Sequence, residues 1–370
     1  MKRVLAAFVA LLASACGLIV GLKDRPLYDG GADATEDGAV DAGGDAPCDG
    51  NYDTDDDNCG RCGHGCLGGK CSKGMCQPVI VATTTRDGGT VRSVTLDETS
   101  TNVYFGSAAG FVDGIIESCP TSGCDAGTVL TSNLAAPPFS IATAGGQVYW
   151  AETAANGPKS VSVDGGTVTS LESGNLPNQM LMNDGHLYWP DARSPNSAVR
   201  TCTPPLCGAT YDTSVTPLLS NGSTAIAIHA TTLYIANEFT SSLQYCTLSN
   251  CNATLLDVGA GKAPDNLAAD DNFLYFTDIN ANNVWRCPAN SACGTPTAVA
   301  TGQATPTEIA IDGSYLYWTN AGTALAVCKL PAPCTANNTF TYTGKIAGLA
   351  FDTSAIYFGN GPTVMRLAKP

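Results

Sequence analysis

An apolar and aromatic pattern recurs seven times along the chain, and "DGSYLYWTN" at 312–320 is one copy of it. Each copy places a polar turn before an apolar residue, a tyrosine, a large apolar residue and a polar stop. The successive tyrosines are separated by 45, 39, 46, 41, 42 and 40 residues. They are Tyr104, Tyr149, Tyr188, Tyr234, Tyr275, Tyr317 and Tyr357. A period of about 42 residues with strand-type sequence predicts a repeat fold.

Every copy follows the same order of apolar segments and turn residues. A strand such as "EIAID" leads through a turn into "LYWTN", and a third strand such as "NVWRC" precedes a fourth such as "TAVAT". Four short strands bounded by Gly, Pro, Asn and Asp are typical of the blade of a β-propeller. The fold class predicted for residues 78–370 is therefore all-β, a seven-bladed β-propeller.

The last copy predicts how the ring closes. It ends after its third strand, "VMRLA", whereas the segment "PVIVATT" at 78–84 stands before the first copy and matches the fourth-strand pattern. We expect this N-terminal strand to complete the last blade, because that pairing removes two open sheet edges and ties the ends of the ring together.

The 17 cysteines of the chain indicate an oxidising compartment. Ten of them form five close pairs between the third and fourth strands: Cys119/Cys124, Cys202/Cys207, Cys246/Cys251, Cys287/Cys293 and Cys328/Cys334. We expect each pair to join the two arms of a hairpin as a structural disulfide. The second copy has a tight Asp-Gly turn instead.

Six further cysteines lie in a segment with few hydrophobic residues, which predicts a small module at 48–77 held by disulfides or metal. They are Cys48, Cys59, Cys62, Cys66, Cys71 and Cys76. Zinc would use Cys59 and Cys62 with His64 nearby, but the export signal described below favours disulfides. The connectivity stays open, because six cysteines allow about fifteen pairings. The "NCGRCGHGC" stretch is similar to small cysteine-rich modules of bacterial surface lipoproteins.

Alternating oxygen-bearing side chains in this module suggest a calcium loop: Asp49, Asn51, Asp53 and Asp55. Thr54 stands where such loops have glycine, and no glutamate follows at the expected distance. An acidic, solvated loop is the alternative interpretation.

The N-terminus resembles a bacterial lipoprotein signal. Lys2 and Arg3 precede the apolar run Val4 to Ala13, and "ASAC" ends at Cys16, the one cysteine left without a partner. The resemblance implies removal of residues 1–15 and lipidation of Cys16, and Gly17 in place of aspartate implies the outer membrane. Ordinary cleavage after Ala15, or an uncleaved anchor over 4–22, are the alternatives.

Residues 16–47 are predicted to form a disordered acidic tether. Twelve carboxylates lie between Asp24 and Asp57, and the segment has almost no aromatic or branched residues with which to form a core. The net charge of −15 argues against nucleic-acid partners.

The polar residue that ends each second strand supports a family resemblance. These residues are Ser107, Glu152, Asp191, Asn237, Asp278, Asn320 and Asn360. In seven-fold register the pattern resembles the YWTD propellers of the lipoprotein-receptor type and, more loosely, the NHL-repeat propellers. The resemblance implies the propeller fold. It carries over no ligand, because several copies depart from YWTD at the third or fourth letter.

Catalytic motifs are not found in the sequence. Only three histidines are present, and there is no H-E-x-x-H, no G-x-S-x-G and no phosphate-binding glycine loop. Propellers bind ligands at the ends of the central channel, near the start of each innermost strand. The residues there are Phe139, Asn178, Gln179, Asp265, Asn266, Thr307 and Glu308. They form a candidate ligand site, with ordinary loop hydration as the alternative.

These features predict a monomeric, non-enzymatic binding or protein-interaction lipoprotein of the cell envelope, periplasmic or surface-exposed, with a protein, peptide or glycan ligand. A membrane contact is expected only through the lipid anchor, and calcium is the one candidate cofactor. The alternative is a propeller enzyme resembling the seven-bladed lyases. Such an enzyme would need a histidine and a carboxylate facing each other at the channel mouth.

Overall fold

The structure is a computed structural model of the chain. It describes residues 50–370 except 153–156, 172–176, 178, 192–197, 205–224, 238–240, 252–255, 258–261, 290, 292, 322, 332 and 336–338. Within these residues no helix has the length and apolar character needed to cross a membrane.

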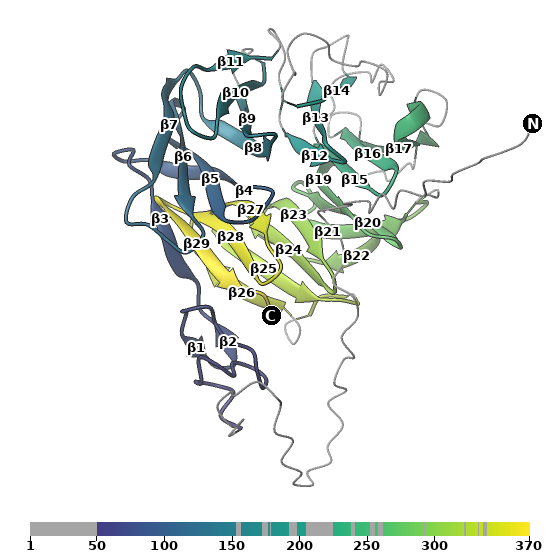
Figure 1. Cartoon of the computed structure of the whole chain (residues 1–370). Coiled ribbons are helices and arrows are strands. Elements are labelled where there is room, and N and C mark those ends of the chain that lie inside the picture. The colour runs from purple at the N-terminus through teal and green to yellow at the C-terminus, as the bar shows by residue number, and fades with distance from the viewer. Residues whose placement is uncertain are drawn as a thin grey trace, which may run out of the picture.

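Seven antiparallel sheets are arranged in a ring, which confirms the predicted seven-bladed propeller (Figure 1). Six of the sheets have four strands, and the third blade has three within the described residues. The innermost strands, β4, β8, β12, β15, β19, β23 and β27, follow one another around the central channel.

The strands of the first four blades lie in chain order from the inside of the ring to the outside. Their bounds are β4 (Thr90–Leu96), β5 (Asn102–Ala109), β6 (Val112–Pro120) and β7 (Thr128–Leu134); β8 (Pro138–Ala144), β9 (Gln147–Glu152), β10 (Lys159–Ser162) and β11 (Thr169–Ser170); β12 (Leu181–Asn183), β13 (His186–Asp191) and β14 (Ala198–Cys202); β15 (Ala225–His229), β16 (Thr232–Asn237), β17 (Ser242–Thr247) and β18 (Leu256–Asp257). A 3₁₀ helix, η1 (Leu248–Asn250), follows β17.

The last three blades have the same order, except that the outermost strand of the seventh comes from the N-terminal side. Their bounds are β19 (Pro264–Ala269), β20 (Phe273–Asp278), β21 (Asn283–Pro288) and β22 (Thr297–Ala300); β23 (Pro306–Asp312), β24 (Tyr315–Asn320), β25 (Ala324–Lys329) and β26 (Thr339–Thr343); β27 (Ile346–Phe351), β28 (Ala355–Asn360), β29 (Thr363–Ala368) and β3 (Val79–Thr83).

The paired aromatic residues of each second strand pack against two different neighbours. Tyr275 of the fifth blade lies in one apolar cluster with Trp318 of the sixth, and Tyr104 of the first blade lies in one cluster with Trp150 of the second. Successive side chains of a strand point to opposite faces, and both faces of a blade are covered by other blades. The tyrosine and the residue after it are therefore both buried, which explains why a tyrosine followed by a large apolar residue recurs in every copy.

Strand β3 closes the ring as predicted. It pairs antiparallel with β29, with Thr83 opposite Thr363 and Val79 opposite Arg366. Just beyond β3, the buried carboxylate of Glu117 on β6 accepts hydrogen bonds from the hydroxyls of Thr84 (2.5 Å) and Thr85 (2.7 Å) and from the Thr85 amide (2.7 Å). Blade one thus binds the segment that completes blade seven.

Four of the predicted cysteine pairs are disulfides in the propeller: Cys119–Cys124, Cys246–Cys251, Cys287–Cys293 and Cys328–Cys334. Cys202 is disulfide-bonded too, and its predicted partner, Cys207, lies outside the described residues.

The expectation that each disulfide joins the two arms of a hairpin is wrong. In blade one the last paired residues of the hairpin are Ser118 and Thr128, so Cys124 lies in the connecting loop. The cysteines are too close in sequence for both to reach paired positions across a loop of this length. Each of the four described disulfides therefore fixes the start of its loop to the end of the third strand.

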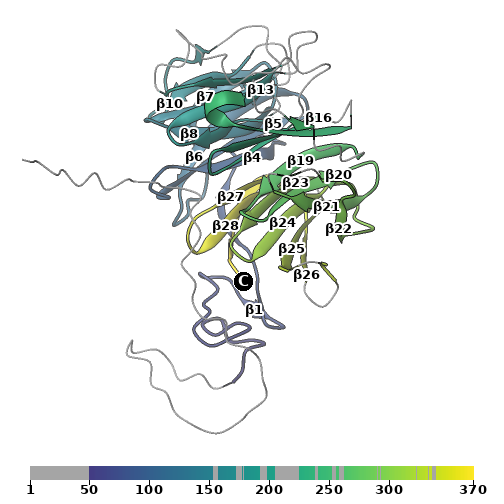
Figure 2. The ribbon, with the colours of Figure 1, turned by 90° about the vertical axis from the view of Figure 1, so that its right-hand side faces the viewer.

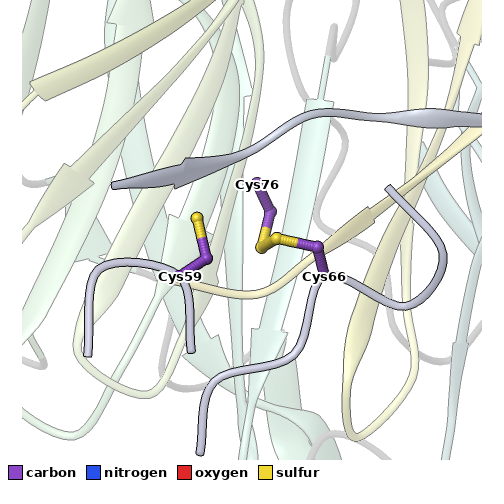
Figure 3. Close-up of side chains that lie close together, drawn as sticks. All are labelled: Cys59, Cys66 and Cys76. Carbon is purple, nitrogen blue, oxygen red and sulfur yellow. A yellow bond between two sulfur atoms is a disulfide. The ribbon is translucent and has the colours of Figure 1, made fainter. Parts of the chain in front are cut away.

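The cysteine-rich module contains β1 (Cys71–Ser72) and β2 (Met75–Cys76), which form a two-stranded sheet. Disulfides join Cys59 to Cys71 and Cys66 to Cys76, and Cys62 is also disulfide-bonded. Figure 3 shows the sulfur of Cys59 beside the Cys66–Cys76 bridge, and the three sulfurs lie within 4.8 Å of one another. Because these sulfurs are oxidised, they are not available as thiolate ligands for zinc.

The module is docked onto the propeller, which the sequence did not predict. In both views it lies against the blades near the C-terminus (Figures 1 and 2). Tyr342 donates to the carbonyl of Cys76 (3.2 Å), and Arg366 donates to the carbonyl of Leu67 (2.7 Å). Its cysteines share an apolar cluster with residues of blades six and seven.

Candidate functional site

The propeller has two faces, which the strand register defines. Pro306, at the start of innermost strand β23, lies opposite Asn320 at the end of β24, and Asn320 lies opposite Ala324 at the start of β25. The face with the starts of the innermost strands and the turns between second and third strands is called the mouth face. The opposite face, with the loops that hold the disulfides, is called the disulfide face.

Irregular pairing occurs at the mouth-face start of five innermost strands. The register shifts between Val91 and Ser93, Pro138 and Ser140, Pro264 and Leu267, Pro306 and Ile309, and Ala347 and Leu349. A bulge adds a residue to one strand and re-aims its side chain, and bulges are common at the rims of closed sheets. Five blades thus have a β-bulge at the same position beside the central channel.

Five of the seven predicted ligand-site residues fall within these bulges. They are Phe139, Asp265, Asn266, Thr307 and Glu308. Gln179 lies just before β12, after an isolated bridge between Pro177 and Asp191, and Asn178 lies outside the described residues. The structure therefore brings the described members of the set to one face.

Several of these polar side chains connect neighbouring blades. The side-chain oxygen of Gln179 accepts a hydrogen bond from the amide of Ile226 in the next blade (2.8 Å). In the same way Glu308 accepts one from the amide of Gly348 (2.9 Å). The Asn266 side chain instead accepts from the amide of Leu267 beside it (2.9 Å). These bonds satisfy backbone groups around the channel, so part of the set has a structural role.

Glu308 has the most perturbed carboxyl group of the mouth face. Burial raises its pKa to about 7, the hydrogen bond from Gly348 opposes this shift, and the nearby Asp265 carboxylate adds to it. The residue as a whole is half-buried. Near neutral pH this carboxyl can therefore exist in either protonation state.

The first blade adds two residues that the sequence analysis missed. Arg92 lies in the bulge of β4 and donates to the carbonyl of Gly110 (3.3 Å). Phe111, at the tip of the β5–β6 hairpin, is 81% exposed, and Val112 beside it is 56% exposed. The sequence indicated this feature through the length of the turn between the second and third strands. Ser107 pairs with Ile115 in blade one, whereas the corresponding Asn320 pairs with Ala324 in blade six. This hairpin therefore projects further from the mouth face than the equivalent hairpin of blade six.

The three histidines of the chain all lie away from the mouth face. His229 ends innermost strand β15 at the disulfide face and pairs with Asp271 (2.8 Å). His186 begins β13 at the same face and contacts the Thr203 hydroxyl (3.0 Å). His64 belongs to the cysteine-rich module. The histidine–carboxylate pair that a lyase would need at the mouth is thus not formed by these residues.

Buried charged residues near the mouth face are matched within their own blades. Lys159 donates to both carboxylate oxygens of Glu152 (2.9 Å each), and Arg200 donates to Asp191 (3.0 Å). Trp150 adds a hydrogen bond to Glu152 (2.9 Å). These residues at the ends of the second strands therefore pair with cations of the neighbouring third strand and do not offer vacant ligand groups.

Two of the candidate calcium residues accept hydrogen bonds within the module. The carboxylate of Asp55 accepts hydrogen bonds from the Asp57 amide (2.9 Å) and the Asn58 side chain (2.8 Å), and these bonds hold its pKa below the ordinary value. Asn51 accepts from the Thr54 hydroxyl (3.1 Å), and Asp49 lies outside the described residues. Calcium binding stays a prediction.

Comparison with known proteins shows the fold and no family. No protein-family model and no curated protein matches the chain. A solved streptogramin B lyase is 16% identical over 79% of this chain and 97% of its own, with a TM-score of 0.59. A catalytically inactive virginiamycin B lyase from Staphylococcus aureus, solved with quinupristin, is 16% identical over 80% of this chain and 99% of its own, with a TM-score of 0.61. BamB from Moraxella catarrhalis is 10% identical over 75% of this chain and 83% of its own, with a TM-score of 0.51.

Proposed function

We propose that the protein is a non-enzymatic binding protein of the cell envelope, anchored through a lipid on Cys16, and that it binds a protein or peptide on its mouth face. The observation that carries this proposal is the asymmetry between the two faces. The disulfide loops and the three histidines lie away from the mouth face, which instead presents Arg92, Phe111, Asp265 and Glu308.

The chemistry of the mouth face fits a macromolecular partner. Aromatic residues and arginine are enriched in protein interfaces, and an exposed aromatic residue can act as an anchor in a pocket of the partner. Phe111 and Val112 supply an apolar tip, with Arg92 behind it. Asp265 and Glu308 lie on blades five and six, and only blade seven separates Glu308 from the first blade. Their carboxyl groups favour a basic group of the partner.

The attachment point favours the same orientation. The tether leads into the cysteine-rich module, which contacts the propeller through Tyr342, Arg366 and Lys369. Lys369 lies beyond the end of β29 on the disulfide face. An anchor at Cys16 would therefore lead to the disulfide face and leave the mouth face available for binding.

Affinity capture from intact cells tests the proposal. The full chain carrying a tag would be compared with a Phe111→Ser/Arg92→Ala variant and with a matched control, His229→Gln, on the disulfide face. We expect the mouth-face variant to lose a captured protein by about tenfold or more, as for an interface anchor, while the control retains it. Equal capture by all three proteins would refute the mouth face as the binding face.

A lyase is the second candidate, favoured only by the shared fold with streptogramin-type lyases. Chromatography of quinupristin after incubation with the purified protein tests it. We expect no conversion, because no histidine of the chain lies at the mouth. Conversion that Glu308→Gln abolishes would instead establish a mouth-face enzyme.

A further inference from the structure

His64 connects the cysteine-rich module to the far end of the chain through both of its ring nitrogens. Nδ1 lies 2.5 Å from the carbonyl oxygen of Cys59 within the module, and Nε2 lies 2.6 Å from the carbonyl oxygen of Lys369 beyond β29. The two contacts join residues 305 apart in sequence. His64 thus lies across the boundary between module and propeller.

The partners of His64 determine its protonation state. A carbonyl oxygen can only accept a hydrogen bond, so each ring nitrogen must carry a proton to bond to its partner. Neutral imidazole has one N–H, and its other nitrogen would place a lone pair against the second carbonyl oxygen. Only the doubly protonated, positively charged ring satisfies both contacts.

The other polar contacts across this boundary do not change charge near neutral pH. Arg366 remains protonated, and burial raises the pKa of Tyr342 to about 12. Both residues therefore keep donating to the module over the whole physiological range. His64 differs from both, because one of its two contacts depends on a second ring proton.

Charged groups on the surrounding elements are already occupied. Lys369 pairs with the Asp312 carboxylate on the propeller. Within the module Asn58 and Lys70 donate to Asp55 and Asp56 and hold their pKa values below the ordinary value, so both stay ionised near neutral pH. Arg61 of the module is exposed.

We propose that a doubly protonated His64 clamps the cysteine-rich module onto the disulfide face, and that this docking weakens when the ring loses a proton as the pH rises. With both ring nitrogens protonated, His64 bonds to the module and to the propeller at once. A neutral ring keeps only one of these two hydrogen bonds, and Arg366, Tyr342 and the apolar contacts then hold the module.

Nitrogen NMR of the full chain labelled with ¹⁵N-histidine tests the protonation state directly. The chain has three histidines, so His186→Gln and His229→Gln variants assign the signals. We expect both ring nitrogens of His64 to be protonated at about pH 6. A neutral ring with one protonated nitrogen at that pH would overturn the proposal, and this readout needs no His64 variant to fold.

Hydrogen exchange tests the consequence for docking. After correction for the intrinsic rate, we expect amides of the module to exchange about tenfold faster at about pH 8.5 than at about pH 6. His64→Gln, which keeps one donor at every pH, should remove this dependence, whereas His186→Gln should leave it unchanged. The same pH dependence in wild type and His64→Gln would contradict the clamp.

Discussion

The buried carboxyl groups of this propeller differ in how many hydrogen-bond donors or cations the surrounding residues supply to them. Glu152 and Asp191 are buried with cationic partners, and Glu117 is buried among hydroxyl and amide donors. Glu308 has one backbone donor and a neighbouring carboxylate. Buried carboxylates with complete sets of donors stabilise the fold, whereas an incompletely compensated one is available for binding.

Glu117→Gln should destabilise the protein by about 2 kcal/mol, because the amide nitrogen would turn a donor toward groups that themselves donate. The amide group keeps one oxygen, so either the Thr84 hydroxyl on Oε2 or the Thr85 hydroxyl and amide on Oε1 would lose their acceptor. Denaturant unfolding measures the change, with Asp125→Asn in the exposed loop of the same blade as control. Equal loss in both variants would show that Glu117 has no special role.

Glu308 should make stability depend on pH. Its pKa is about 7 in the folded protein against an ordinary value of 4.5, so between these values the folded state binds more protons than the unfolded state. The free energy of unfolding should therefore be highest below this window and fall as the pH rises through it.

Comparison with Glu308→Gln isolates this contribution from that of every other group. The difference in unfolding free energy between wild type and variant should change across the window, and Asp265→Asn should shift that change to lower pH. A difference that is constant with pH would contradict the perturbed carboxyl.

At the scale of the element, the closing strand and the bulged innermost strands determine what the ring can present. Strand β3 supplies the fourth strand of blade seven, and Glu117 holds the residues that follow it. The bulges occur in strands of several blades, so the mouth face varies in side chains and keeps its backbone shape. The binding properties of the mouth face therefore depend on a few bulge positions and on the long β5–β6 hairpin.

Removal of β3 should be far more costly than removal of the module alone. A chain beginning at residue 85 exposes the edge of β29 and the apolar side chains packed on it, for a loss of several kcal/mol, roughly 3 or more. A chain beginning at residue 78 keeps β3 and serves as the control. Equal melting temperatures for these two chains would show that β3 does not stabilise the ring.

Most of the blade structure could be predicted from the sequence. Both faces of every blade are buried, and consecutive large apolar residues in each second strand indicate burial on both faces. Closure of the ring by β3 was also predictable, because the last copy of the repeat has only three strands and a fourth-strand pattern precedes the first copy. The docked module was not, since its contacts use backbone carbonyls of Cys76 and Leu67 that carry no sequence signal. Arg92 and Phe111 were missed because the first copy departs from the repeat there, although the longer turn was visible in the sequence.

At the scale of the whole molecule, we propose that a lipid anchor, the cysteine-rich module and the propeller follow one another, with the mouth face farthest from the membrane. Lipidation at Cys16 is a prediction that metabolic labelling with a fatty acid checks. Cys16→Ser or globomycin treatment should abolish the label and release the protein from the outer membrane fraction. Labelling that persists in the Cys16→Ser protein would refute the lipid anchor.

Site-specific photo-crosslinking in intact cells tests the central claim most directly, that the mouth face is the binding face. A photoreactive residue would replace Phe111 or Ala281 on the mouth face, and Asp125 or Asp271, both exposed, on the disulfide face. We predict that one protein partner is crosslinked from the mouth-face positions and not from the disulfide-face positions. A partner crosslinked from Asp125 or Asp271 and not from Phe111 or Ala281 would contradict the account.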